Sequence, residues 1–115
     1  MMRSLLFLSL LAPVGFSKVA KTFVMDNRAM STVRVGMGHS TVLSFPSKPQ
    51  KVVLGNKGVF GVEYIENDLA LTSLKPRARS NLFVYLEGER FGFDLLGEVG
   101  SGDEIIFVKR KDKNP

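Results

Sequence analysis

The stretch LALTSLKPRARSNLFVYLEGERFGFDL, residues 69–95, decides the expected fold of this chain. Its central run, residues 81–86, is rich in β-branched and aromatic residues, which favour a half-buried strand. Strand alternation places three aliphatic side chains on one face of this run, and Phe83 and Tyr85 on the other. Because both faces are apolar, we expect the run to lie inside a sheet or to offer one face to a partner.

A second strand follows the first after a short break. Residues 90–95 alternate, with Phe91, Phe93 and Leu95 on one face, and the turn Glu87-Gly88-Glu89 separates them from the first run. Glycine readily takes the left-handed conformation that tight turns need. Two apolar-patterned runs around a short glycine turn predict a β-hairpin.

Short strand candidates fill the rest of the chain, and no long segment has helical periodicity. Turn signals recur about every ten residues, which is typical of a β-sandwich or a small barrel. We therefore expect an all-β fold, specifically a small β-sandwich of about eight short strands. The candidates are residues 31–35, 41–45, 51–54, 59–65, 69–74, 81–86, 90–95 and 105–108.

Three further expectations concern burial. The run KVVL at residues 51–54 is apolar after its first residue, which is typical of a buried strand. Tyr64 is expected among apolar neighbours, with its hydroxyl reaching water or a carbonyl. Asp103 and Glu104 follow a glycine-rich segment, and both are expected to be exposed.

Residues 1–17 have the pattern of a cleaved secretory signal peptide. Arg3 supplies the positive charge and residues 5–11 form an apolar run that is too short to span a bilayer. Gly15 and Ser17 are small residues suited to a cleavage site, so we expect cleavage after Ser17 and a periplasmic location. An uncleaved N-terminal anchor and a buried first strand are the alternatives.

The rest of the chain is expected to comprise an N-terminal arm at 18–30, a β-sandwich domain at 31–109 and a disordered basic tail at 110–115. Within the arm, Phe23-Val24-Met25 suits an edge strand, whereas its charged flanks favour a mobile segment, and both interpretations stay open. Charge density predicts disorder for the tail.

Composition narrows the chemistry. A chain of 115 residues makes one domain, and its 16 Lys and Arg against 11 Asp and Glu give a formal net charge of +5. That excess is compatible with acidic partners, anionic lipid headgroups or nucleic acid. The chain has no cysteine, which excludes a disulfide, a thiolate nucleophile and a cysteine metal site.

His39 is the one histidine, and it does not indicate a catalytic site. Its neighbour Ser40 would point to the opposite face of a strand, so the two side chains are poorly placed as a nucleophile and base. Glu87, Glu89 and Asp94 are interpreted as a solvated hairpin tip. We therefore expect no enzyme activity, no small-molecule substrate, no cofactor and no metal.

A basic connection precedes the hairpin, and we expect it to contribute to a partner-binding surface. Lys75, Arg77 and Arg79 lie in this connection, and arginines of this kind can hold carboxylates bidentately. Together with Phe83 and Tyr85 they form the candidate site. The alternative interpretations are a solvated loop and an aromatic-basic surface for nucleic acid, which would make the chain an OB-like nucleic-acid-binding domain.

Several motifs in order resemble the N-terminal domain of the VirB9/TrbG/CagX family. They are LKP at 74–76, SNLFV at 80–84 and FGFDL at 91–95, where Ser80 and Phe91 stand for a threonine and a tyrosine of the family pattern. Upstream, GHSTVLSFP at 38–46 and KVVLG at 51–55 are similar both to that family and to the N-terminal domain of pilus-type secretins.

The resemblance implies a periplasmic component of a type IV secretion, conjugation or pilus assembly apparatus. Members of the family carry a second, channel-forming β-domain that residues 1–115 do not contain, so the expected role is accessory or regulatory. The expected partner is another envelope protein, either a secretion or pilus subunit or a small flexible regulatory protein, bound by strand addition. We expect no nucleic-acid partner, and membrane association only through partners.

Overall fold

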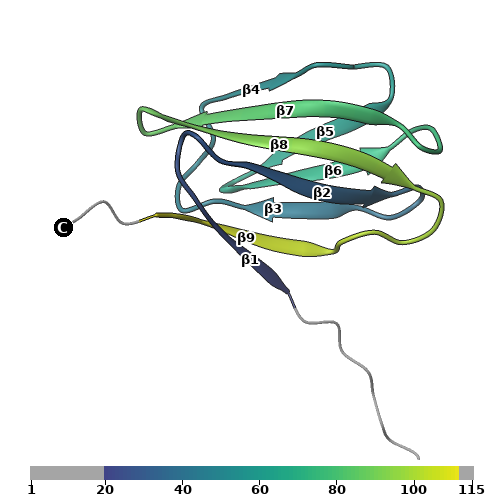
Figure 1. Cartoon of the computed structure of the whole chain (residues 1–115), viewed down its shortest axis with the longest axis horizontal. Coiled ribbons are helices and arrows are strands. Elements are labelled where there is room, and N and C mark those ends of the chain that lie inside the picture. The colour runs from purple at the N-terminus through teal and green to yellow at the C-terminus, as the bar shows by residue number, and fades with distance from the viewer. Residues whose placement is uncertain (1–19, 112–115) are drawn as a thin grey trace, which may run out of the picture.

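The computed structural model describes residues 20–111, and these form nine strands with no helix (Figure 1). The strands are β1 (Lys21–Met25), β2 (Met30–Gly36), β3 (Thr41–Ser44), β4 (Lys51–Leu54), β5 (Phe60–Ile65), β6 (Asp68–Ser73), β7 (Arg79–Leu86), β8 (Glu89–Glu98) and β9 (Ile105–Arg110).

The strands make two sheets that stack face to face. Sheet A has the order β1-β9-β3-β6-β5, and sheet B has the order β2-β8-β7-β4. Three of the pairings are parallel, namely β1 with β9, β3 with β9 and β2 with β8, and the others are antiparallel. The expected all-β sandwich is confirmed, with β1 as a strand additional to the eight candidates.

The hairpin that decided the expected fold is present as β7 and β8. Its loop has two residues, Glu87 with φ 49° and Gly88 with φ 75°, both in the left-handed region that a type I′ turn requires. Glu89 therefore belongs to β8 rather than to the turn. β7 lies inside sheet B between β8 and β4, as its two apolar faces predicted.

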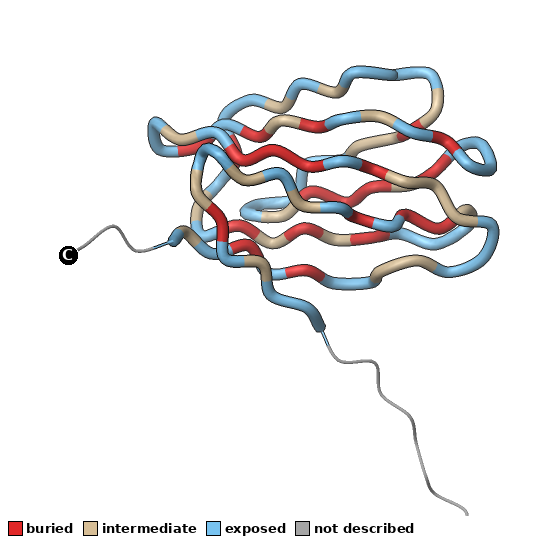
Figure 2. The backbone as a smooth tube through the Cα atoms, viewed as in Figure 1, coloured by how far each residue is buried: buried red, intermediate tan, exposed pale blue. Residues whose placement is uncertain are grey.

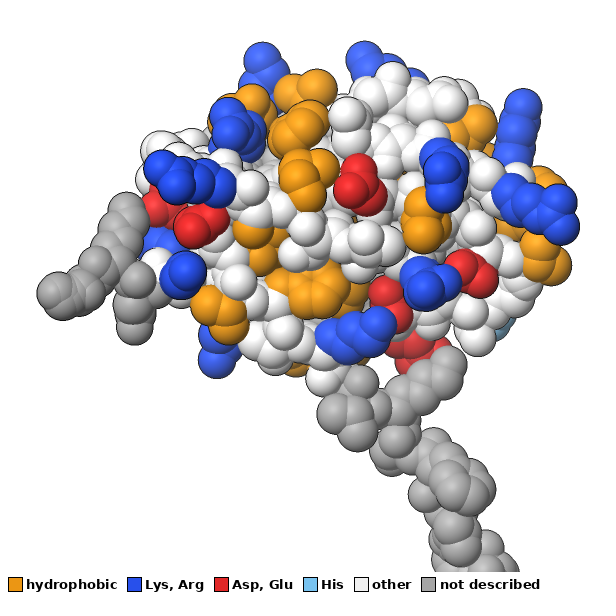
Figure 3. Space-filling model, viewed as in Figure 1, with side chains coloured by type: hydrophobic (Ala, Val, Ile, Leu, Met, Phe, Trp, Pro, Cys, Tyr) orange, Lys and Arg blue, Asp and Glu red, His pale blue; other side chains and the backbone are white. Residues whose placement is uncertain are grey.

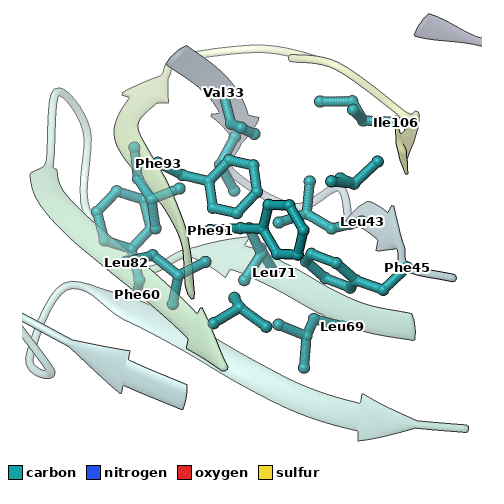
Figure 4. Packing of buried hydrophobic residues seen from close by; sticks show 14 of the residues in the cluster. Val33, Leu43, Phe45, Phe60, Leu69, Leu71, Leu82, Phe91, Phe93 and Ile106 are labelled. Carbon is teal, nitrogen blue, oxygen red and sulfur yellow. The ribbon is translucent and has the colours of Figure 1, made fainter. Parts of the chain in front are cut away.

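The core lies between the sheets (Figure 2). Buried residues alternate with more exposed ones along the second half of β7, whereas β8 has three consecutive buried residues, 91–93. Phe45 from the end of β3 packs against Phe91 and Phe93 of β8, with ring centroids 6.2 and 6.1 Å apart (Figure 4). Burying each such ring stabilises the fold by about 2–3 kcal/mol. The inward pattern predicted for the hairpin is confirmed, because Leu82, Val84, Leu86, Phe91, Phe93 and Leu95 are all fully buried.

Two burial expectations are wrong because the segments lie at sheet edges. β4 is the edge strand of sheet B, and its residues are exposed or half-buried rather than enclosed. Tyr64 lies near the end of β5, the edge strand of sheet A, and is 55% exposed. An edge strand has a neighbour on one side only, so an apolar sequence there is not covered by the sheet itself.

The N-terminal segment is ordered as a strand from Lys21 onward. β1 pairs in parallel with β9 at the edge of sheet A, and Met25 is 1% exposed, so of the two open interpretations the structure has the edge strand. The expected signal peptide at 1–17 lies outside the described residues, as does the tail at 112–115. Arg110, assigned to the disordered tail, is instead the last residue of β9.

Asp103, expected to be exposed, joins four segments and has only 9% of its side chain exposed. Its carboxylate accepts the backbone N–H of Arg34 at 3.0 Å and pairs with Lys21 Nζ at 2.7 Å. Its backbone carbonyl accepts the Thr41 hydroxyl at 2.5 Å, and its N–H donates to Arg34 O at 2.8 Å. The connection between β8 and β9 is thereby held against β1, β2 and β3.

Candidate protein-binding site

The outer face of sheet B carries three of the five predicted partner-binding residues. Arg79, Phe83 and Tyr85 are alternate residues of β7, so their side chains leave the same face of the sheet. The inward residues of the same strand are buried, which leaves this set on the side away from the core. Strand alternation predicted the shared face of Phe83 and Tyr85, whereas Arg79 was expected in the connection and is instead the first residue of β7.

Phe83 lies at the centre of an apolar row that crosses all four strands of sheet B. The strand register aligns it with Gly92 of β8, Met30 of β2 and Val53 of β4. A Cβ on Gly92 would meet Met30 Sδ and would lie 3.1 Å from Phe83 Cε1, so these two side chains close over the glycine. Met30 is 47% and Val53 41% exposed, which makes the row accessible to a partner.

We call Met30, Phe83 and Val53 the apolar row. Sequence reasoning found only Phe83, because Met30 was assigned to an arm and Val53 to a buried strand. Figure 3 shows hydrophobic side chains in a band across β4, β7 and β8, with Lys and Arg side chains and a few Asp and Glu side chains around it. Local sequence patterns carry no signal for this band, since it is assembled by pairing of strands distant in the chain.

Tyr85 extends the apolar row toward the hairpin turn and has basic neighbours on both sides. The register places Arg90 of β8 and Lys51 of β4 directly beside it, and its side chain is 38% exposed. Arg90 Nη2 also donates to Asn27 O at 3.0 Å, which fixes the arginine against the turn before β2. An aromatic ring between two cations suits an acidic or carbonyl-rich partner surface.

The two remaining predicted residues lie at the opposite end of β7. Lys75 and Arg77 belong to the connection before the strand, and Arg77 has φ 57° in the left-handed region. Arg77 and Arg79 line a shallow hollow beside Leu96 and Glu98. Arg79 and Tyr85 are six positions apart along β7, which is roughly 20 Å. The five predicted residues therefore do not form a compact cluster: Lys75, Arg77 and Arg79 lie at or before the start of β7, and Phe83 and Tyr85 lie toward its other end.

The carboxylates at the hairpin tip hold an arginine. Arg110 Nη2 pairs with Glu87 Oε1 at 2.5 Å and Arg110 Nε with Glu89 Oε1 at 2.8 Å, which ties the β7–β8 turn to the end of β9. The hydrogen bond from Arg110 is the main cause that lowers the pKa of Glu87 below its ordinary value. Glu87 is still 51% exposed and Asp94 is exposed, as expected of a solvated tip, whereas Glu89 has only 22% of its side chain exposed.

No cluster of metal-binding side chains is found in residues 20–111. His39 is exposed in the bend after Gly38, and no group of three His, Asp or Glu side chains in the described residues could hold a metal ion. Within the same residues, no helix has the length and hydrophobicity that a membrane crossing needs.

The fold and this surface define an all-β sandwich with an exposed apolar and basic face. No protein-family model matches the sequence, and no curated protein matches it either.

Proposed function

We propose that this chain is an exported protein-binding module, similar to VirB9/TrbG-family N-terminal domains, that serves a type IV secretion or pilus assembly apparatus as an accessory or regulatory component. The observation that carries the proposal is the apolar row with its basic margins. Met30 and Val53 are exposed on the outer face of sheet B and Phe83 between them is half-buried, so the row leaves hydrophobic area in contact with water.

A contiguous apolar surface with a charged rim is the usual anatomy of a protein-binding site. Burial of such a row under a partner removes apolar area from water, while Lys51 and Arg90 on either side of Tyr85 select for an acidic rim on that partner. The partner is another envelope protein, and no small molecule is required.

Nucleic-acid binding is the alternative. It is less well supported, because an OB-fold is a five-stranded barrel whereas residues 20–111 form nine strands in two open sheets. Raising the ionic strength separates the two functions. Binding to nucleic acid should weaken steeply with salt through counterion release, whereas a contact centred on the apolar row should persist.

Capture of partners by the tagged full-length chain, expressed in its own host and purified from the periplasmic fraction, tests the proposal. Tyr85→Asp and the double change of Arg77 and Arg79 to Ala should lose the same partner. Val24→Asp is the matched control, because Val24 is 61% exposed on β1, away from sheet B. Recovery of the protein only in the cytoplasm, or equal capture by Tyr85→Asp and wild type, would contradict the proposal.

A further inference from the structure

We propose that the outer edge of β5 receives an extended basic segment of a partner protein as a sixth strand of sheet A. This inference rests on the proposed function and gives it a particular edge and a partner chemistry. It concerns the sheet opposite to the one that carries the apolar row.

The backbone of β5 has hydrogen-bonding groups available along this edge. Leu74 N–H donates to Val59 O at 2.9 Å, so these two residues are a hydrogen-bonded pair. Hydrogen-bonded and non-hydrogen-bonded pairs alternate along antiparallel strands, and this bond therefore shows which residues of β5 are bonded to β6. By that alternation, the N–H and C=O groups of Phe60, Val62 and Tyr64 point away from β6. In the part of the chain that the structure describes, no strand lies against that side of β5.

β5 is the least protected of the four sheet edges. β4 has only four residues, carries Lys51 and follows Pro49, and β1 carries Lys21. The edge of β2 is bonded in part to Asp103 through Arg34. β5 has six residues with no lysine, arginine or proline, and Glu63 is its one charged residue, so it has fewer of the devices that usually block strand addition.

An apolar seam lies beside this edge. β4 and β5 are on the same rim of the sandwich, joined by the short connection 55–59 (Figure 1). Val52, Leu54 and Val62 point inward there and are only partly buried against the core. A strand added to β5 would direct every second side chain toward this seam, so the incoming segment should be apolar at alternate positions.

The charge of the β5–β6 hairpin favours particular residue types at the other positions of the incoming segment. From Val59 to Leu74 the chain has three acidic residues, Glu63, Glu66 and Asp68, and no basic ones, although the whole chain has a net charge of +5. Glu63 is exposed on the outer face of β5. Lysine or arginine at the alternate positions of an incoming strand would lie beside it, which is the favourable cross-strand arrangement.

The same charge argues against a second copy of the chain bound through the same edge. Two β5 strands paired with each other would bring two acidic hairpins together, and like charges repel across strands. The described ends of the chain, at residues 20 and 111, adjoin β1 and β9 across sheet A from β5. The occupant we commit to is therefore a basic, alternating segment of a different protein.

Amide hydrogen exchange of the full chain, followed by NMR with a synthetic peptide, tests the inference. The probe is a six-residue peptide of alternating Val and Lys, matched to the six residues of β5, and the control alternates Val and Glu. At saturating probe, the N–H groups of Phe60, Val62 and Tyr64 should exchange about tenfold more slowly, since each gains a hydrogen bond. Gly61 and Glu63, already bonded to β6, should not change.

Two variants sharpen the test. Glu63→Lys should weaken binding of the Val-Lys peptide about fivefold, which is the size expected for reversal of an exposed charge. Asp94→Lys on sheet B should leave binding of this peptide unchanged. Val62→Pro removes one outward N–H and should abolish binding, with Val24→Pro on β1, at the opposite edge of sheet A, as its control. Folding of each variant is checked by circular dichroism.

Protection that is absent, or that falls on Val52 and Leu54 of β4, would overturn the inference, as would equal binding of the Val-Glu peptide. Concentration-dependent dimerisation that Glu63→Lys abolishes would also overturn it, since the occupant would be a second copy. If Tyr85→Asp loses the native partner while Glu63→Lys retains it, the proposed function stands and the edge assignment fails. If Glu63→Lys loses the native partner while Tyr85→Asp retains it, β5 is supported as the binding edge and the apolar row is rejected as the binding site.

Discussion

Asp103→Ala is the change with the clearest expected effect on stability. The side chain of Asp103 is 9% exposed and accepts the backbone N–H of Arg34 at 3.0 Å. Alanine would leave that donor at the strand edge without its partner. It would also release Lys21 Nζ, which lies 2.7 Å from the carboxylate. The change therefore affects the attachment of both β1 and β2.

The magnitude follows from the two contacts. A hydrogen bond to a charged group is worth about 1.5–3 kcal/mol, and we take the lower half because the bond lies near the surface. The ion pair adds about 0.2–1 kcal/mol, since the Lys21 side chain is 54% exposed. Asp103→Ala should thus lower the free energy of unfolding by roughly 2–3 kcal/mol and the Tm by roughly 10–20 °C.

Urea denaturation followed by circular dichroism measures this difference, with thermal melting as a second readout. Asp103→Asn keeps an oxygen acceptor for Arg34 N–H and should lose only about 1 kcal/mol. Glu63→Ala removes an exposed carboxylate of β5 and serves as the matched control. If Asp103→Ala unfolds within about 0.5 kcal/mol of that control, the reasoning is refuted and Asp103 does not hold the strands together.

Three further predictions concern the core, a close backbone approach and an ion pair. Phe93→Ala should lower the free energy of unfolding, measured by urea denaturation, by about 3–5 kcal/mol, because the ring is fully buried. A smaller loss would mean that neighbouring side chains move into the space that the ring leaves. Gly36→Ala should lower the Tm measurably, since a Cβ would lie 2.8 Å from Gly102 N and 3.0 Å from Ser101 Cα, whereas Gly61→Ala meets nothing within 4 Å and should not. Arg110→Gln should raise the pKa of Glu87, followed by NMR titration, toward its ordinary 4.5. Because the folded-state pKa is lowered, the stability from this pair is present above pH 4.5 and is lost as the pH falls below it, and Arg110→Gln should reduce that dependence.

The hairpin shows how far local sequence could predict this protein. The alternation in residues 81–86 and 90–95 and the glycine of the turn follow from geometry that a few neighbouring residues determine, and all of it is present in β7 and β8. The same rule placed Phe83 and Tyr85 on one outer face.

Expectations that depended on distant partners were incomplete or wrong. Tyr64 and the run at 51–54 have apolar sequences, but their positions at sheet edges leave them accessible. Asp103 follows glycines like an exposed loop residue, yet contacts from β1, β2 and β3 enclose it. None of these partners is near Asp103 in the chain.

The sequence by itself determined the all-β class, the hairpin and the inward set of core residues, because alternation and turn conformation are properties of short segments. Only the tertiary structure decided which exposed residues gather on one surface. Met30 and Val53 reach Phe83 through the pairing of β2 with β8 and of β4 with β7. The order of strands also decided that β5 has an open edge. Strand order is set by which pairings bury the most apolar area across the whole domain, and that is a sum over contacts no single segment contains.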